Sequence, residues 1–358
     1  MKIATIVGAR PQFIKAAVLS IAMKEAGLEE VMIHTGQHYD YEMSELFFQQ
    51  LGLAPPAYNL GVGSANHGAQ TARILEGVEQ ILLAGRFDVL LVYGDTNSTL
   101  AGALAAAKLL IPVAHVEAGL RSFNRRMPEE VNRVLTDHVS DLLFAPTEGA
   151  MANLIGEGID RAKIHVTGDV MLDAVIRFEP LFAKQREDVL STLGVEPRTY
   201  FVATIHRAEN TDDPIRLGAI TAALETIAVG IGPVVWPVHP RTRTKLAASG
   251  LELNHVQLIE PIGYLEMQAL LGEARGALTD SGGLQKEAAF HGLPTITLRD
   301  ETEWTETVEA GVNVLAGADP ERIVASARNA SGRFRPPPGF GRGDAARIIA
   351  SAILERIH

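Results

Sequence analysis

Cysteine is absent from the 358 residues of the sequence. Its absence excludes disulfides, iron–sulfur clusters, thiolate zinc sites and cysteine nucleophiles. Long apolar runs are absent as well, and Arg10 interrupts the apolar N-terminus before a signal-peptide core could form. A chain without cysteine suits a reducing compartment, so we expect a cytoplasmic location and no membrane association.

Positively charged residues are fewer than negatively charged ones, 32 Lys and Arg against 43 Asp and Glu, and the formal net charge is −11. Such a chain repels a polyphosphate backbone, so nucleic acid is not an expected partner. An anionic ligand would need a local cluster of basic residues. The composition, 47% hydrophobic and 21% charged, is that of a globular protein. Two domains are expected, since single cores stop growing at roughly 250–300 residues.

The chain alternates short β-rich runs with helical patterns, which indicates βα units on parallel sheets. The first series ends with KIHVTG at residues 163–168. A helical bridge at residues 173–193 then leads to a second series, which begins with TYFVATI. The predicted fold class is α/β, with two Rossmann-like domains facing across a cleft. The expected domains are residues 1–168 and residues 169–343.

Carboxylates follow the predicted strands of the first domain, where ligands of such sheets bind. Asp95 follows one strand in GDTNST, Glu117 ends the next in HVEAG, and Glu129 comes after a short loop in PEEVNR. Like charges at close range raise one another's pKa values toward neutrality, as acid–base catalysis requires. Purely structural roles would be a helix N-cap at Asp95 or Thr96 and a helix start at PEEVNR.

A glycine-containing helix start follows a predicted strand of the second domain in TDSGGLQKEA. The backbone N–H groups of Ser281, Gly282 and Gly283 can point at an anion at the helix N-terminus. Glu287 lies one turn further on, within reach of a ribose diol if a nucleotide diphosphate occupies the glycines. A serine N-cap would explain Ser281 alone, but neither the glycines nor the carboxylate.

Basic residues also gather at predicted strand ends. Arg10 and Lys15 in GARPQFIK could clamp a diphosphate, although the motif taken alone also fits a solvated helix start. HRAEN places His206 and Arg207, and PVHPRT places His239, at strand ends of the second domain. No third ligand with fixed spacing accompanies the histidines, so no metal site is predicted. No strand is predicted before GVGSANHG, and GFGRG follows a proline-rich loop, so neither is expected to be the dinucleotide fingerprint, and a nicotinamide cofactor is disfavoured.

Nine motifs, in order along nearly the whole chain, resemble those of the non-hydrolysing UDP-N-acetylglucosamine 2-epimerase family. They are GARPQFIK, GQH, GDTNSTLA, HVEAGLRS, MPEEVNR, HRAEN, PVHPRT, TDSGGLQKEA and RDETEW. The resemblance implies the glycosyltransferase-B architecture, with a UDP-binding second domain and the last helix, residues 344–358, packing back on the first. It also implies a UDP-sugar substrate, no cofactor, a homodimer and a common role in making precursors of surface polysaccharide.

The implied reaction is inversion at C2 of a UDP-2-acetamido sugar, converting UDP-N-acetylglucosamine to UDP-N-acetylmannosamine. The C2 proton is not acidic, because no carbonyl occupies the adjacent ring carbon. Anti elimination of UDP would give a 2-acetamidoglucal, to which UDP re-adds while a proton reaches the other face. This route needs carboxylates at C2 and cations at the departing diphosphate.

By motif position, the resemblance assigns three sets of residues. The catalytic set is Asp95, Glu117, Glu129 and His206. Proton transfer at C2 is expected from Asp95 and Glu129, with Glu117 positioning the sugar or sharing the relay. The set that binds UDP and substrate is Arg10, Lys15, Arg207, Ser281, Gly282, Gly283 and Glu287. The set resembling residues that hold a second, activating UDP-sugar is Gln37, His38, Arg73 and His239.

Two positions depart from the family pattern. Gln12 stands in GARPQ where an acid is common, and Trp304 stands in DETEW where an arginine is common. These variants resemble a branch that acts on UDP-2,3-diacetamido-2,3-dideoxyglucuronate. Arg125 and Arg126 could serve its extra carboxylate, or they form a solvated basic turn. The sequence is also compatible with a hydrolysing epimerase, a glycosyltransferase of the same architecture or a non-catalytic UDP-sugar sensor.

Overall fold

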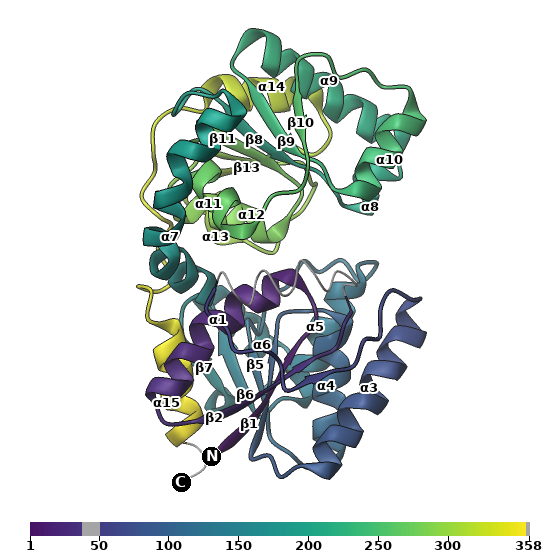
Figure 1. Cartoon of the computed structure of the whole chain (residues 1–358), viewed down its shortest axis with the longest axis vertical. Helices are drawn as coiled ribbons and strands as arrows, with labels where there is room; N and C mark the ends of the chain where they lie inside the picture. The colour runs from purple at the N-terminus through teal and green to yellow at the C-terminus, as the bar shows by residue number, and fades with distance from the viewer. Residues whose placement is uncertain (38–50, 356–358) are drawn as a thin grey trace. The chain divides into compact units, whose positions relative to one another are not determined.

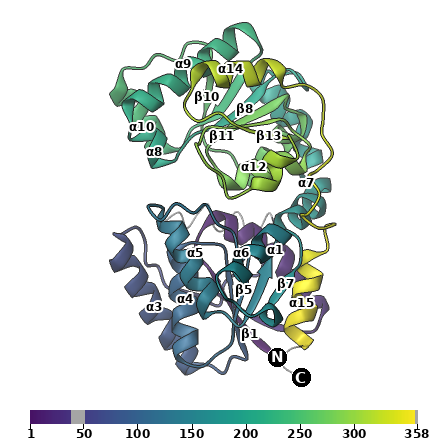
Figure 2. The same cartoon turned by 180° about the vertical axis from the view of Figure 1, so that it is seen from behind.

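A computed structural model describes residues 1–37 and 51–355 (Figure 1). Two compact units make up the chain: Met1–Arg177 with Gly339–His358, and Phe178–Pro338. Each unit contains one parallel sheet with helices on both sides (Figures 1 and 2). The predicted α/β class is confirmed. No helix in the described ranges is long and apolar enough to cross a membrane.

The sheet of the first unit has seven strands in the order β3-β2-β1-β4-β5-β6-β7, and every pair is parallel. Central strands such as β4, VLLVY, are buried at every position because helices cover both faces of the sheet. The strands are β1 Lys2–Val7, β2 Glu29–His34, β3 Tyr58–Asn59, β4 Val89–Tyr93, β5 Val113–Val116, β6 Leu142–Ala145 and β7 Ile164–Val166.

The helices of the first unit include the C-terminal one, α15, which lies beside α1 and contacts it (Figure 1). The predicted helical bridge is confirmed as α7, in which Pro180 lies three residues beyond the division between the units. The helices are α1 Arg10–Glu25, α3 His67–Ala84, α4 Asn97–Lys108, α5 Pro128–Val139, α6 Glu148–Gly156, a 3₁₀ turn at Arg161–Lys163, α7 Val170–Leu193, which continues into the second unit, and α15 Ala345–Glu355.

The second sheet has six parallel strands in the order β10-β9-β8-β11-β12-β13. Its strands are β8 Phe201–Thr204, β9 Val234–Pro237, β10 Gln257–Ile259, β11 Gly276–Thr279, β12 Thr295–Thr297 and β13 Asn313–Leu315. The accompanying helices are α8 Ala208–Thr211, α9 Pro214–Gly230, α10 Pro240–Ser249, α11 Tyr264–Glu273, α12 Gly282–Phe290, α13 Thr305–Glu309 and α14 Pro320–Asn329.

Both sheets have the doubly wound order. The chain adds strands on one side of its first strand and then, after one reversal, on the other side. The reversal lies between β1 and β4 in the first sheet and between β8 and β11 in the second. Ligands of such sheets bind outside the carboxyl ends of the strands at this point. In the first unit Arg10 and Asp95 follow these strands, and in the second His206 and Ser281 do.

The N-terminus of α15 is held by a buried carboxylate of α7. Asp173 accepts hydrogen bonds from the backbone N–H groups of Ala345, at 3.2 Å, and Ala346, at 2.8 Å. Burial raises the pKa of Asp173 from its ordinary value of 3.8 to about 6, although the two N–H groups oppose the rise. Asp169 and Asp344 add like charge and raise it further.

We expect Asp173→Asn to change how stability depends on pH. Because the folded-state pKa is raised, the contribution of Asp173 is fully present below about pH 4 and is lost as the pH rises through 6. The free energy of unfolding of the variant, relative to the parent, should therefore rise by up to about 3 kcal/mol between pH 4 and 7.5. Urea unfolding at both pH values measures this.

The matched control is Asp319→Asn. Asp319 caps α14 in the same manner, accepting from the N–H groups of Glu321 and Arg322, but it is exposed. Its substitution measures what the loss of a cap of the same geometry costs at an exposed position. A stability change for Asp173→Asn that stays constant between pH 4 and 7.5 would contradict the raised pKa.

Candidate active site

The turn between β1 and α1 is fastened to the end of β4 by the Gln12 side chain, which is buried. Its Oε1 accepts from the N–H groups of Gly8, at 2.7 Å, and Ala9, at 3.0 Å. Its Nε2 donates to the carbonyl oxygen of Tyr93 at 2.7 Å. A carboxylate could not make that last bond, so the amide found in place of the common acid has a structural reason. Arg10 begins α1 directly after this turn.

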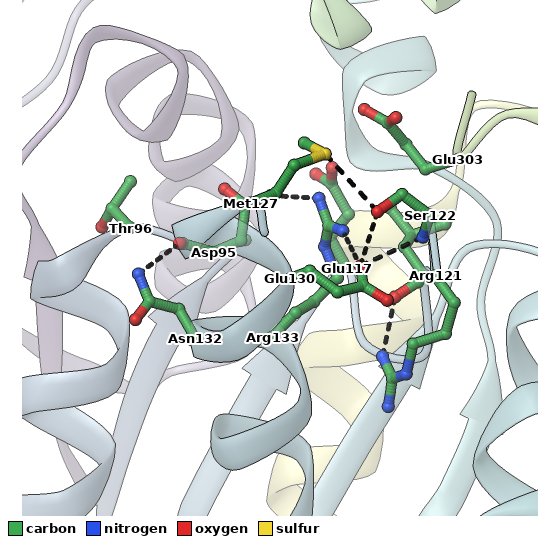
Figure 3. A network of polar contacts seen from close by, with 12 residues as sticks. Asp95, Thr96, Glu117, Arg121, Ser122, Met127, Glu130, Asn132, Arg133 and Glu303 are labelled. Carbon is green, nitrogen blue, oxygen red and sulfur yellow. Dashed lines mark hydrogen bonds and ion pairs between the residues drawn. The ribbon is translucent and has the colours of Figure 1, made fainter. Parts of the chain in front are cut away.

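Asp95 projects from the turn after β4 and forms an ion pair with the buried guanidinium of Arg133 on α5 (Figure 3). The amide of Asn132 donates to the Asp95 carbonyl oxygen at 2.9 Å. The side chain of Thr96, rather than Asp95, caps α4, since it accepts from the N–H of Thr99. The Asp95 carboxylate is therefore not needed for the cap, and 30% of its side chain is exposed.

Glu117 lies at the tip of β5 with a φ of +73°, in the left-handed region that non-glycine residues seldom occupy. Its carboxylate forms an ion pair with Lys15 of α1, whose side chain is buried. The N–H of Glu117 donates to the Phe144 carbonyl oxygen at 3.1 Å, which helps hold the tip. Backbone strain of this kind concentrates at functional sites.

The carboxylate pair at the start of α5 divides into two roles. Glu130 is buried and accepts from the N–H groups of Ser122 and Phe123, both at 3.0 Å, and from Arg133 at 2.7 Å. It therefore holds the loop after β5 in place. Glu129, the preceding residue, is partly exposed and remains the catalytic candidate of the pair.

In the same loop Arg125 and Arg126 are exposed, so both interpretations of this basic turn stand. Among residues 1–37 and 51–355, no group of three or more histidine or carboxylate side chains is placed to hold a metal ion.

In the second unit, Asp280 organises the HRAEN turn. Its buried carboxylate accepts from the N–H groups of His206, at 3.1 Å, and Arg207, at 3.0 Å, and from the side-chain amide of Asn210, at 3.1 Å. The ring Nδ1 of His206 lies 3.3 Å from the same carboxylate. Because 47% of the His206 side chain remains exposed, a ligand can reach it.

The helix α12 begins with the two predicted glycines, and Ser281 caps it by accepting from the N–H of Leu284. A Cβ at Gly282 would lie 2.1 Å from Glu303 Oε1, so a side chain there would have to displace that carboxylate, which is bonded to Arg299. A Cβ at Gly283 would meet nothing closer than Ser281 Oγ, at 3.8 Å. Packing therefore does not explain Gly283, whereas close approach of a ligand to the backbone would.

Glu287 is held one turn into α12 by a short chain of buried side chains. The Nε2 of Gln268 donates to Glu287 at 2.7 Å, and His291 Nε2 lies 2.8 Å from Gln268 Oε1. Burial, with the charges of Arg333 and Arg186, lowers the pKa of His291 to about 4. The ring is therefore neutral at pH 7 and donates its proton to Gln268, which fixes the Glu287 carboxylate.

Trp304 stands at the position where an arginine is expected from the family pattern. A cation nevertheless lies beside it. The ammonium of Lys286, on α12, lies 4.4 Å from the centroid of the Trp304 ring, close enough for a cation–π interaction. The indole Nε1 lies 3.5 Å from the position of a Cβ on Gly282. Lys286 and Trp304 are both buried, so this pair lines the interior beneath the start of α12.

The four residues predicted for a second ligand site are divided between the two units. Gln37 uses its Oε1 to accept from Ser98 N, at 2.9 Å, and Ser98 Oγ, at 2.6 Å, while Arg73 is exposed on α3. His239 caps α10, and burial, with the charges of His206 and Arg241, lowers its pKa. His38 lies outside the described residues.

Several polar residues of these sites did not figure among the predicted ones. Arg133 pairs with Asp95, Asp280 holds the HRAEN turn, and Asn132 supports the backbone of Asp95. Two of them had a usable signal. Asp280 directly follows a strand, at the edge of the sheet where ligands bind, and Arg133 stands three residues after Glu130, a spacing at which side chains meet on a helix.

The fold and the site together define the class of the protein. It is a two-domain enzyme of the nucleotide-sugar class, with two doubly wound units, cation-paired carboxylates at strand tips and a helix that begins with glycines. Residues 21–354 match the profile of the family described as UDP-N-acetylglucosamine 2-epimerase. The UDP-2,3-diacetamido-2,3-dideoxy-D-glucuronate 2-epimerase of Pseudomonas aeruginosa is 53% identical, over 99% of this chain and 100% of its own length. The UDP-N-acetylglucosamine 2-epimerase of Methanococcus maripaludis is 44% identical, over 99% and 98%.

A solved structure agrees with these sequence relatives. The Methanocaldococcus jannaschii UDP-GlcNAc 2-epimerase, crystallised with UDP-GlcNAc and UDP, superposes with a TM-score of 0.92 at 42% identity, over 99% of this chain and 100% of that one. The chain belongs to the UDP-N-acetylglucosamine 2-epimerase family. The resemblance drawn from the nine motifs is confirmed, and with it the enzyme class, an isomerase.

Proposed function

We propose that this protein inverts C2 of UDP-2,3-diacetamido-2,3-dideoxyglucuronate by eliminating and re-adding UDP, without a cofactor and without hydrolysis. One observation carries the proposal. Asp95 and Glu117 follow β4 and β5, which are neighbours in the sheet, and each carboxylate is paired with a buried cation. Carboxylates at adjacent strand tips can supply groups that take a proton from an unactivated carbon and return one to it.

Inversion at C2 needs two proton-transfer groups, because the proton leaves one face of the sugar and returns to the other. In the forward step a carboxylate takes the C2 proton, a C1–C2 double bond forms, and the bond from C1 to the UDP oxygen breaks. In the return step that oxygen adds to C1 and a second group delivers a proton to C2. We assign these transfers to Asp95 and Glu129, with Glu117 positioning the sugar or sharing the relay.

The UDP that departs carries extra negative charge, which the second unit is suited to hold. The start of α12 offers backbone N–H groups at Gly282 and Gly283, and the helix dipole favours an anion there. His206 and Arg207 follow β8, the neighbour of β11, and can contact the diphosphate. Donors fixed in advance stabilise such charge without reorganisation.

The choice of sugar rests on likeness to the relative from Pseudomonas aeruginosa, whose name specifies the diacetamido glucuronate. Trp304 and Gln12 depart from the common pattern in the direction of that branch. UDP-N-acetylglucosamine is the second candidate, because the superposed Methanocaldococcus jannaschii enzyme was crystallised with it.

Comparison of the two UDP-sugars as substrates tests this choice. We expect kcat/KM to be about 10- to 100-fold higher for the diacetamido glucuronate, the amount that a charge-assisted hydrogen bond to its carboxylate contributes. The assay uses purified protein with no added nicotinamide. A preference for UDP-N-acetylglucosamine would reassign the substrate, and stoichiometric release of free UDP would identify a hydrolysing enzyme instead.

A homodimer and a cytoplasmic location form part of the proposal. Membership of the family supports both. Analytical ultracentrifugation of the purified protein tests the first, and fractionation of cells that express it tests the second.

A further inference from the structure

We propose that His115 and Asp137 act as a buried clamp that fixes Asp95 and Glu117 relative to one another, so that both are positioning residues for epimerisation. The inference rests on the proposed function, because that function assigns proton transfer to Asp95 and makes Glu117 the residue that positions the sugar or shares the relay. Neither clamp residue is expected to touch the sugar. Each acts through the backbone of a strand tip.

His115 lies in the middle of β5 and is fully buried. Its ring Nδ1 lies 2.7 Å from Asp137 Oδ1, and its Nε2 lies 2.8 Å from the carbonyl oxygen of Gly94. Both partners offer acceptor oxygens, so the ring bridges the Asp137 carboxylate on α5 and the backbone at the end of β4. Gly94 directly precedes Asp95, so this second bond holds the β4 tip from behind.

Asp137, on α5, uses its other oxygen to hold the β5 tip. Asp137 Oδ2 accepts from the N–H of Gly119, at 3.1 Å, and from Arg121 Nη1, at 2.7 Å. Gly119 follows Glu117 by two residues, and a Cβ there would lie 2.3 Å from a carbonyl oxygen of α6, so this stretch has little freedom to move. A single carboxylate therefore links the backbone around Glu117 to the His115 ring behind Asp95.

The surroundings of Asp137 favour its ionised form. Burial raises the pKa of Asp137, but the hydrogen bonds and charges of His115 and Arg121 outweigh it and leave the pKa below its usual value. Arg121 is in turn bound by the partly exposed Glu157 through two bonds of 2.7 Å. His115, Asp137 and Arg121 thus form a hydrogen-bonded buried network, in which the loss of one member leaves a buried partner unsatisfied.

Rigidity matters here because Asp95 and Glu117 are proposed to act on the same sugar. A displacement of about 1 Å between reacting groups can cost roughly 100-fold in rate. An ordinary buried ion pair would stabilise the fold to the same extent without connecting two catalytic tips. The two interpretations differ in what happens to kcat in a variant that stays folded.

The test is His115→Phe in the full chain, with urea unfolding to establish that the variant is folded. Phenylalanine fills the space of the ring but donates to neither acceptor. We expect kcat to fall about 30- to 100-fold with KM within about twofold of the parent. We also expect more glycal and UDP to be released per epimerisation, because misaligned carboxylates complete the return step less often.

A second variant, His115→Gln, keeps a donor toward the Gly94 carbonyl. On a logarithmic scale it should restore at least about a third of the kcat that His115→Phe loses. It carries the test if the phenylalanine variant fails to fold. His165→Phe is the matched control, because His165 lies on β7 of the same sheet. The control should retain the parent kcat.

A folded His115→Phe with kcat within threefold of the parent would overturn the clamp, and so would an equal loss in His165→Phe. Failure of the parent protein to epimerise any UDP-sugar is a different result. It would refute the proposed function, and the clamp would fall with it.

Discussion

Asp95→Asn is expected to lower the kcat of epimerisation by about 1000-fold or more, the contribution that general acid–base groups commonly make. Asparagine has the shape of aspartate and can still accept a hydrogen bond from Arg133, so the turn after β4 should keep its conformation. It cannot take or return a proton at C2. The affinity for UDP, measured by calorimetry, should therefore change little while turnover nearly stops.

The matched control for this substitution flanks the other end of the same strand. Asp88 directly precedes β4 and accepts from the N–H of Lys2 at 2.7 Å, at the end of the sheet opposite the candidate site. Asp88→Asn should leave kcat unchanged. Activity of Asp95→Asn within about threefold of the parent would remove Asp95 from the mechanism.

Gly283→Ala is expected to weaken UDP binding by about 30-fold or more without destabilising the protein. The new Cβ has room among the protein's own atoms, since its nearest neighbours are Ser281 Oγ, at 3.8 Å, and Glu287 Oε1, at 4.0 Å. Alanine also favours a helix by about 0.5–1 kcal/mol over glycine. The methyl group would instead occupy the space of a diphosphate lying on the backbone.

Two other glycines serve as control positions for Gly283→Ala. Gly218, within α9, has similar room, with Leu251 Cδ2 as its nearest neighbour at 3.9 Å, so Gly218→Ala should affect neither binding nor stability adversely. Gly282→Ala should destabilise the fold through Glu303. Unaltered UDP affinity in Gly283→Ala, measured by calorimetry, would favour the plain N-cap over the phosphate site.

The architecture could be predicted from the sequence because its signals are local. Alternating apolar runs and helical patterns mark each βα unit, and the polar residue after each strand marks the functional edge of the sheet. These signals identify Asp95, Glu117 and the two glycines of α12, and each lies at the tip of a strand or at the start of a helix.

The partners of these residues could not be predicted in the same way, because they depend on contacts between distant segments. His115 and Asp137 are 22 residues apart, and nothing in the spacing indicates that they meet. Glu129 and Glu130 are adjacent, but successive residues of a helix point about 100° apart, and only the packing of α5 determines which is buried.

The cations beside the predicted carboxylates could not be identified, for the same reason. The sequence predicted carboxylates whose like charges raise one another's pKa values, but not which cations pair with them. In the first unit Asp95 is paired with Arg133, and Glu117 with Lys15, from α5 and α1 respectively. Each cation lies in one of the nine motifs, but its pairing requires the folded sheet.

The most direct test of cofactor-free epimerisation is a proton NMR time course in D₂O, with the diacetamido glucuronate as substrate and no nicotinamide present. The mechanism predicts a second epimer and deuterium at C2 in both epimers, because the proton leaves to one carboxylate and returns from another that exchanges with solvent. Epimerisation that retains the original proton at C2 would contradict the elimination and re-addition of UDP.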